Sequence, residues 1–217
     1  MSTLHLIVRH FADVSPAEEL RLLALLTHAD IEGIAKYPIT RKNQQLARAW
    51  RREILAQALH VWPAQLIFEK AAHGKPYLAN QKISFNTSHC DEAFAMVWSV
   101  DNIQLGIDIE DKNKIRKEQA LAARTFSAME MKAWQNPDFS PHQAHEQWLT
   151  TWTRKEAVLK AHGLGIRLDL NSLNTENADD TLKHSLLGEW HYRSFNMDEQ
   201  MVSVASQSQS DEIEIVL

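Results

Sequence analysis

Two acidic residues, Asp108 and Glu110, alternate along a segment that has the composition of a β-strand. Side chains at positions i and i+2 of a strand point to the same face, which places these two Cα atoms about 6.5 to 7 Å apart. Two carboxylates at that spacing can share one divalent cation, whereas without a cation they need a counterion or a raised pKa. Acids on the solvated face of a hairpin are the alternative interpretation, which the spacing alone favours.

A second row of residues recurs every four positions: Trp148, Trp152, Glu156 and Lys160. On a helix these side chains share one face, so a stripe that buries two tryptophans at one end presents an acid and a lysine at the other. An ordinary Glu–Lys pair is the structural alternative and is worth only about 0.3 to 0.5 kcal/mol. Three acids from two elements, together with a lysine, supply what magnesium-assisted phosphoryl chemistry requires, namely hard oxygen ligands and a cation for the phosphate charge.

Two shorter segments carry groups that can bind phosphate. Residues 73–76 form a tight turn that presents Lys75, and residues 85–89 end a strand with hydrogen-bond donors. Each signal is weak alone, and a single histidine such as His89 is more often structural than functional. Cys90 follows it and could be a thiol nucleophile, but neighbours on a strand point to opposite faces, so we expect Cys90 to pack in the core.

Start signals and strand-forming runs predict that these groups lie on strands and on one long helix. Capping residues indicate helices after Ser15, Thr40, Ser127 and Ser140, the last running to His162 and stopping at Gly163. Strands are predicted at residues 4–9, 65–69, 83–86, 93–100, 103–110, 190–195, 201–206 and 213–217. Asp101-Asn102 predicts a hairpin between 93–100 and 103–110. Residues 168–187 are polar and show no clear pattern.

The helix predicted after Thr40 has an apolar row and a basic face. Leu46, Trp50 and Ile54 recur at four-residue spacing, which is typical of a buried stripe. The basic face carries Arg41, Lys42, Arg48, Arg51 and Arg52. Its arginines cluster by the three-and-four spacing of a helix, so this face can meet an anion or steer an acidic partner.

The composition excludes several classes of protein. The 217 residues are 44% hydrophobic and 24% charged, as in a globular protein of one large or two small domains. Lys plus Arg at 23 against Asp plus Glu at 28 gives -5, so we expect no nucleic-acid partner. The apolar runs fall far short of the roughly 20 residues that cross a bilayer, and the first residues lack signal-peptide features. We therefore expect no membrane partner and a cytoplasmic location, which agrees with a single cysteine.

Taken together, these segments resemble the larger, surfactin-synthetase-activating (Sfp-type) class of 4'-phosphopantetheinyl transferases. The matching residues are Gly74-Lys75-Pro76, Phe85 to His89, Gly106 to Glu110, Phe126-Ser127 with Glu130, and Trp152 to Lys160. A glycine-x-aspartate-x-glutamate strand, followed about 45 residues later by tryptophan-x-x-lysine-glutamate-x-x-x-lysine, is a specific combination. Outside residues 74–165 the match is only to a general layout, which includes an arginine-bearing helix.

The resemblance implies roles for individual residues. It assigns magnesium to Asp108, Glu110 and Glu156, and it names Glu156 also as the candidate base for the incoming serine. Lys160 resembles the lysine that contacts the phosphate during transfer, so Glu110, Glu156 and Lys160 are the predicted catalytic groups. The coenzyme A contacts that it implies are Lys75, Ser88, His89, Lys160 and, less closely matched, Arg48 and Arg52.

The resemblance also implies a fold and a reaction. The expected fold is α+β, a pseudo-dimer of two similar halves, residues 1–101 and 102–217, with the metal acids in the second half and the site in the cleft between them. The expected enzyme is a monomer that uses magnesium to transfer 4'-phosphopantetheine from coenzyme A to a serine of an apo acyl or peptidyl carrier protein, releasing adenosine 3',5'-bisphosphate.

Two other functions fit the same residues. A magnesium-dependent phosphoesterase would use three acids and a lysine equally well, with water in place of a carrier protein. A non-catalytic protein could keep the fold and bind coenzyme A or a carrier without turnover. The presence of all three acids and of Lys160 argues against this last function.

Overall fold

The structure, a computed structural model, describes residues 2–32, 34, 38–114, 116–163, 168–197, 199–207 and 212–216. The strands are β1 (Thr3–His10), β2 (Phe68–Lys70), β3 (Pro76–Leu78), β4 (Ser84–His89), β5 (Ala93–Ser99), β6 (Leu105–Asp111), β7 (Thr181–His184), β8 (Gly188–Met197), β9 (Gln200–Ser206) and β10 (Glu212–Ile215). The helices are α1 (Pro16–Leu23), α2 (His28–Ile31), α3 (Pro38–Leu59), α4 (Glu118–Thr125), α5 (Ala128–Trp134) and α6 (Pro141–His162). Single 3-10 turns lie at Phe11–Asp13, Pro63–Gln65 and Leu170–Ser172. The predicted α+β class is confirmed.

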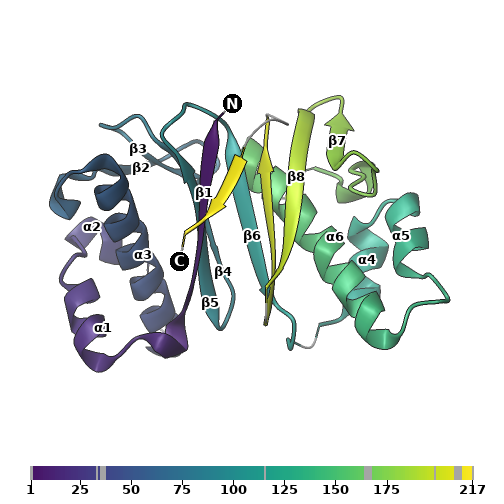
Figure 1. Ribbon diagram of the computed structural model, residues 1–217, viewed down its shortest axis with the longest axis horizontal. Helices are drawn as coiled ribbons and strands as arrows, with labels where there is room; N and C mark the ends of the chain where they lie inside the picture. The colour runs from purple at the N-terminus through teal and green to yellow at the C-terminus, as the bar shows by residue number, and fades with distance from the viewer. Residues whose placement is uncertain are drawn as a thin grey trace.

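These elements form four layers, with two sheets between two groups of helices (Figure 1). One sheet has the order β10-β1-β5-β4 and the other has the order β6-β9-β8-β7, while β2 and β3 pair separately. Helices α1 to α3 lie on the outer side of the first sheet, and α4 to α6 lie on the outer side of the second. Strands β4 and β6, which carry candidate site residues, are therefore end strands of two facing sheets.

The buried side chains follow the predicted periodicities. The row Leu46, Trp50 and Ile54 of α3 packs in one core with Phe94 and Met96 of β5. Alternate residues of β5 face the other way, where they meet the apolar side of β6 that the alternation predicted: Leu105, Ile107 and Ile109. Because both faces of β5 are covered, it is a central strand of the molecule.

The predicted hairpin between residues 93–100 and 103–110 is wrong. Strand β5 pairs with β1 on one edge and β4 on the other, while β6 pairs with β9 of the second sheet. Both hydrogen-bonding edges of β5 are thus occupied, so the residues after Ser99 carry the chain across to the facing sheet. Two strand runs with a turn signal between them do not distinguish a hairpin from such a crossing.

Other boundaries are confirmed or shifted. Helix α6 begins after the capping box of Ser140 and Gln143 and ends at Gly163, whose φ is +85°, as predicted. Helix α3 begins at Pro38, before the predicted cap at Thr40. The predicted strand at 65–69 is a 3-10 turn followed by β2, and the last predicted strand is β10, with Leu217 outside the described residues. Among the described helices, none combines the length and the apolar character that a membrane span requires.

Gly106 lies where β6 and α6 approach most closely. A Cβ atom at this position would overlap the carbonyl oxygen of Ala157 and would lie within 2.8 Å of Cα of Ala161. Backbone atoms of a helix cannot rotate away as a side chain can, so Gly106→Ala must push α6 off the sheet. We expect the free energy of unfolding to fall by about 1 to 3 kcal/mol in urea denaturation. An unchanged unfolding midpoint would contradict this close approach.

Candidate active site

Three elements bring their polar side chains together at the edge of the second sheet, where β6 adjoins β4 and the last turns of α6. The Nζ atom of Lys160, on α6, lies 2.6 Å from Oδ1 of Asp108 on β6 and donates to Oγ of Ser88 on β4 at 2.7 Å. The Ser88 hydroxyl in turn donates to Oδ1 of Asp108 at 2.9 Å. Residues predicted as a lysine for phosphate, a metal acid and a coenzyme contact therefore form one cluster, in which Asp108 and Ser88 are buried and Lys160 is half-buried.

Glu110 is held by two residues that the sequence did not single out for this purpose. The indole Nε1 of Trp152 donates to Oε1 of Glu110 at 3.0 Å, and Arg116 forms an ion pair with the other carboxylate oxygen. Trp152 is itself fixed because its ring stacks on Trp148, with centroids 5.6 Å apart, and Trp148 is fully buried. The orientation of the Glu110 carboxylate is thus set from both sides.

Two carboxylate oxygens are buried without a hydrogen-bond partner among the described residues: Oδ2 of Asp108 in this cluster and Oε1 of Glu156, which lies on α6 one turn before Lys160. Burial raises the pKa of Glu156 to about 7, and the negative charges of Asp108 and Glu110 add to the effect while Lys160 opposes it. Burial and the charge of Asp108 also raise the pKa of Glu110, against the influence of Arg116 and Trp152. Unpartnered buried oxygens cost free energy, so their presence indicates a site prepared for a ligand.

The chemistry of these donors fits a hard divalent cation. Carboxylate oxygens are the ligands that such cations prefer, and the two unpartnered oxygens keep lone pairs available for one. As the side chains stand, no group of three or more His, Cys, Asp or Glu residues in the described part of the chain is arranged to hold a metal ion. A cation would therefore require the carboxylates of Asp108, Glu110 and Glu156 to adjust around it.

A basic cavity lies beside this cluster. It has a volume of about 260 Å³, and its lining includes Arg48, Arg51, Ser88 and His89. A second cavity of about 470 Å³ shares Arg48 and Arg51 with it and continues toward Lys70. Because Ser88 belongs both to the first cavity and to the acidic cluster, an anion in the cavity would lie next to the acids.

The arginines of α3 point in different directions. Arg52 is 2% exposed, pairs with Asp30 at 2.6 Å and donates to the carbonyl oxygen of Leu66. Arg48 donates to the carbonyl oxygens of Asp30 and Glu32 while it lines both cavities. The predicted coenzyme contacts of Arg48 and Arg52 stay predictions. The guanidinium of Arg52 already donates to Asp30 and to backbone carbonyl oxygens within the protein.

Arg51 was predicted on the basic face of α3 but not among the coenzyme contacts. It lines both cavities, its guanidinium lies 4.0 Å from the centroid of the Phe68 ring, and its buried Nε has no hydrogen-bond partner among the described residues. Burial lowers its pKa to about 10. Its spacing of three residues from Arg48 indicates that the two arginines share a helix face. That spacing alone does not show which arginines line the cavity.

His89 and Lys75, both predicted coenzyme contacts, lie in different surroundings. His89 is exposed at the end of β4, where it lines the basic cavity. Lys75 donates from Nζ to the carbonyl oxygens of Leu105 at 2.9 Å and Ala161 at 2.7 Å, and burial lowers its pKa to about 8. Its coenzyme contact stays a prediction, and it does not line the cavity beside Ser88.

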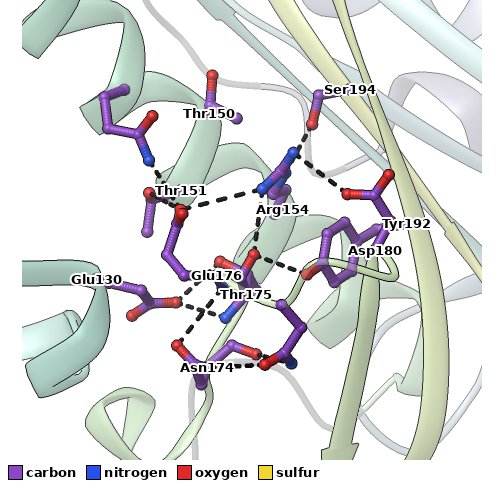
Figure 2. A network of polar contacts seen from close by, with 12 residues as sticks. Glu130, Thr150, Thr151, Arg154, Asn174, Thr175, Glu176, Asp180, Tyr192 and Ser194 are labelled. Atoms are coloured by element: carbon purple, nitrogen blue, oxygen red, sulfur yellow. Dashed lines mark hydrogen bonds and ion pairs between the residues drawn. The ribbon is translucent and has the colours of Figure 1, made fainter. Parts of the chain in front are cut away.

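Helix α6 is anchored on its other sides by a polar network (Figure 2). Arg154 donates to Oγ of Ser194 at 3.0 Å and to the carbonyl oxygen of Thr175 at 3.1 Å, and Glu176 accepts from Gln147 at 2.8 Å. These contacts tie α6 to β8 and to the segment before β7, which shows no clear pattern in the sequence. The network holds the helix that carries Glu156 and Lys160.

The surroundings of Cys90 confirm a packing role. Its thiol donates to Oδ1 of Asp111 at 3.0 Å, and both burial and the neighbouring carboxylate raise the pKa of the thiol far above its ordinary value. We expect no alkylation of the native protein by iodoacetamide at pH 8 under conditions that label the urea-unfolded chain, as measured by intact mass. Equal labelling rates of the native and unfolded chains would contradict this assignment.

Comparisons with known proteins agree with the geometry. Residues 104–205 match the model of the 4'-phosphopantetheinyl transferase superfamily. The chain is similar to the 4'-phosphopantetheinyl transferase gsp of Aneurinibacillus migulanus, at 33% identity over 56% of this chain and 48% of that protein. It is also similar to the 4'-phosphopantetheinyl transferase HetI of a Nostoc species, at 32% identity over 70% of this chain and 65% of that protein. A Bacillus subtilis 4'-phosphopantetheinyl transferase is 32% identical over 59% of this chain and 55% of its own length. The aligned part of the chain spans about half to two thirds of the length of these relatives.

Proposed function

Since the chain belongs to the 4'-phosphopantetheinyl transferase superfamily, we propose that it transfers 4'-phosphopantetheine from coenzyme A to a serine of an apo acyl or peptidyl carrier protein. The serine oxygen forms a bond to the phosphorus next to pantetheine, and the pyrophosphate P–O bond breaks. Adenosine 3',5'-bisphosphate leaves with the electron pair of that bond. The observation that carries the proposal is the cluster of Asp108, Glu156 and Lys160 beside a basic cavity.

We assign the metal to Asp108, Glu110 and Glu156. The unpartnered oxygens of Asp108 and Glu156, and the position of Glu110 on the same face of β6 as Asp108, support this assignment. Magnesium bound to these acids would neutralise charge on the pyrophosphate. The assignment predicts that removal of magnesium by a chelator stops transfer.

The chain's own residues supply the remaining chemistry. Lys160, which already contacts Ser88 and Asp108, offsets the charge that develops on the phosphate being transferred. Glu156 accepts the proton of the serine hydroxyl, directly or through water, at its free oxygen. Ser88 orients Lys160 and Asp108, because its hydroxyl accepts from Lys160 and donates to Asp108.

The basic cavity is the proposed place of the coenzyme A phosphates. Arg48, Arg51 and His89 line it, and an arginine guanidinium suits phosphate because it offers several donors in one plane. Arg51 joins the predicted contacts because its Nε is buried without a partner among the described residues. Lys75 and Arg52 are bonded to protein groups instead.

The pseudo-dimer is part of the same proposal. Each four-stranded sheet is covered by one helix of 22 residues, α3 on the first and α6 on the second, which supports two related halves. The division at residues 1–101 and 102–217 remains a prediction, and β10, from the end of the chain, pairs with β1 of the first sheet. A monomeric state and a cytoplasmic location are also predictions.

Release of adenosine 3',5'-bisphosphate, followed by liquid chromatography, separates this function from its rivals. We expect release from coenzyme A only when both magnesium and an apo carrier protein are present. Release without any carrier would favour the phosphoesterase. Binding of coenzyme A in calorimetry, without release in the presence of several apo carriers, would favour the non-catalytic protein.

A further inference from the structure

Lys75 lies in a hydrogen-bonded turn between β2 and β3. The N–H of Ala71 donates to the carbonyl oxygen of Lys75 at 2.9 Å, and the N–H of Gly74 donates to that of Ala71 at 2.8 Å. Gly74 takes a φ of +88°, a conformation that residues with a side chain rarely adopt. The Lys75 side chain therefore leaves the turn from a fixed point.

The ammonium of Lys75 joins this turn to two elements of the second sheet's layer. Its acceptors are the carbonyl oxygen of Leu105, at the start of β6, and that of Ala161, in the last turn of α6. Carbonyls in the last turn of a helix lack partners within the helix, and a cation is favourable there. Two of the three N–H donors of Lys75 are thus used to connect β6 with α6.

This junction adjoins the candidate active site. Ala161 directly follows Lys160, whose Nζ lies 2.6 Å from Asp108, and Gly106 at the start of β6 contacts the same turn of α6. A shift of this turn would move Lys160 and Glu156 relative to Asp108. Displacements of about 1 Å in a catalytic group can lower a rate by about a hundredfold.

We propose that Lys75 is a positioning residue: its ammonium fastens the end of α6 to the start of β6 and thereby sets Lys160 and Glu156 opposite Asp108. This role replaces the coenzyme contact that the resemblance implied for Lys75. Its consequence for rate rests on the proposed transferase function, whereas the fastening itself does not.

Steady-state kinetics separate the two roles of Lys75. We expect Lys75→Met to lower kcat by at least about tenfold, with a KM for coenzyme A within about twofold of the wild-type value. Lys75→Arg keeps donors that can reach the carbonyls and should recover part of kcat. Lys75 also lines a third cavity, separate from the basic cavity, and the exposed Lys82 lines it too. Lys82→Met removes a positive charge from this third cavity and serves as the matched control. A raised KM with an unchanged kcat would overturn the proposal.

Hydrogen exchange tests the fastening without any activity. In Lys75→Met, amides of residues 159–163 and 105–109 should exchange faster than in wild type, whereas Lys82→Met should leave them unchanged. Unchanged exchange in Lys75→Met would overturn the proposal even if kcat fell. Faster exchange in a protein that transfers nothing would support the fastening and refute the proposed function instead.

Discussion

Glu156→Gln is expected to lower kcat/KM for transfer by at least two orders of magnitude while leaving the protein as stable as wild type or more stable. The substitution removes a carboxylate that we assign both to the metal and to the serine proton, and general-base groups alone contribute about 10²- to 10⁴-fold. The same change removes a negative charge from a buried place beside Asp108 and Glu110. Relief of that repulsion offsets any loss of packing, because glutamine has nearly the same shape.

The measurement pairs initial rates with thermal unfolding of the same preparations. Glu146→Gln is a matched control, since Glu146 lies on the same helix and accepts a hydrogen bond from Asn196 far from the acidic cluster. We expect this control to keep its transfer rate. A Glu156→Gln protein with full activity would refute the mechanism, and one that is unfolded would refute the account of the unpartnered oxygen.

Lys155→Met is expected to cost about 3 to 5 kcal/mol of unfolding free energy, as does the breaking of other buried ion pairs. Lys155 precedes Glu156 but points to another side of α6, where Nζ lies 2.5 Å from Glu130. The exposed side-chain fractions of the two residues are 1% and 0%. Nζ also donates to the carbonyl oxygens of Thr125, Leu170 and Leu173.

The loss of unfolding free energy is large because Glu130 also accepts hydrogen bonds from other residues. Its carboxylate accepts from the backbone N–H of Ser127, which completes the cap of α5. It also accepts from the backbone N–H and the hydroxyl of Thr175 (Figure 2). Without the ammonium, that carboxylate is left buried without its cation. Urea unfolding measures the effect, and Lys183→Met, which breaks an exposed pair with Glu189, should change stability by no more than about 0.5 kcal/mol.

A double-mutant cycle distinguishes the ion pair from a general packing defect. Lys155→Met combined with Glu130→Gln should destabilise less than the sum of the two single changes, because each single change leaves the other charge unpaired. Additive losses would contradict the interpretation of this pair as a coupled unit.

The sequence predicted those parts of the molecule that depend on local periodicity. Alternation placed Asp108 on one face of a strand and Ile107 on the other, and four-residue spacing placed Glu156 and Lys160 together on α6. Both placements follow once the strand or the helix forms and buries its apolar side.

Long-range pairing explains what the sequence did not predict. Whether β5 pairs with β6 depends on β1 and β4, which occupy the two edges of β5. Strand β4 directly precedes β5, but β1 comes from a distant part of the sequence, so its pairing with β5 follows no local pattern. The inward turn of Arg52 depends on Asp30 of α2, so helical spacing in α3 could not separate it from Arg51. The partners of Lys75 lie 30 and 86 residues away, beyond any local pattern.

Intact-mass spectrometry of an apo carrier protein, incubated with coenzyme A, magnesium and this chain, tests the central claim most directly. Transfer of one phosphopantetheine group adds about 340 Da to the carrier, a gain set by the chemistry of the coenzyme. We predict this gain with wild type, its loss when magnesium is chelated, and its loss with Glu156→Gln. A folded wild-type protein that adds no mass to apo acyl or peptidyl carriers would contradict the claim.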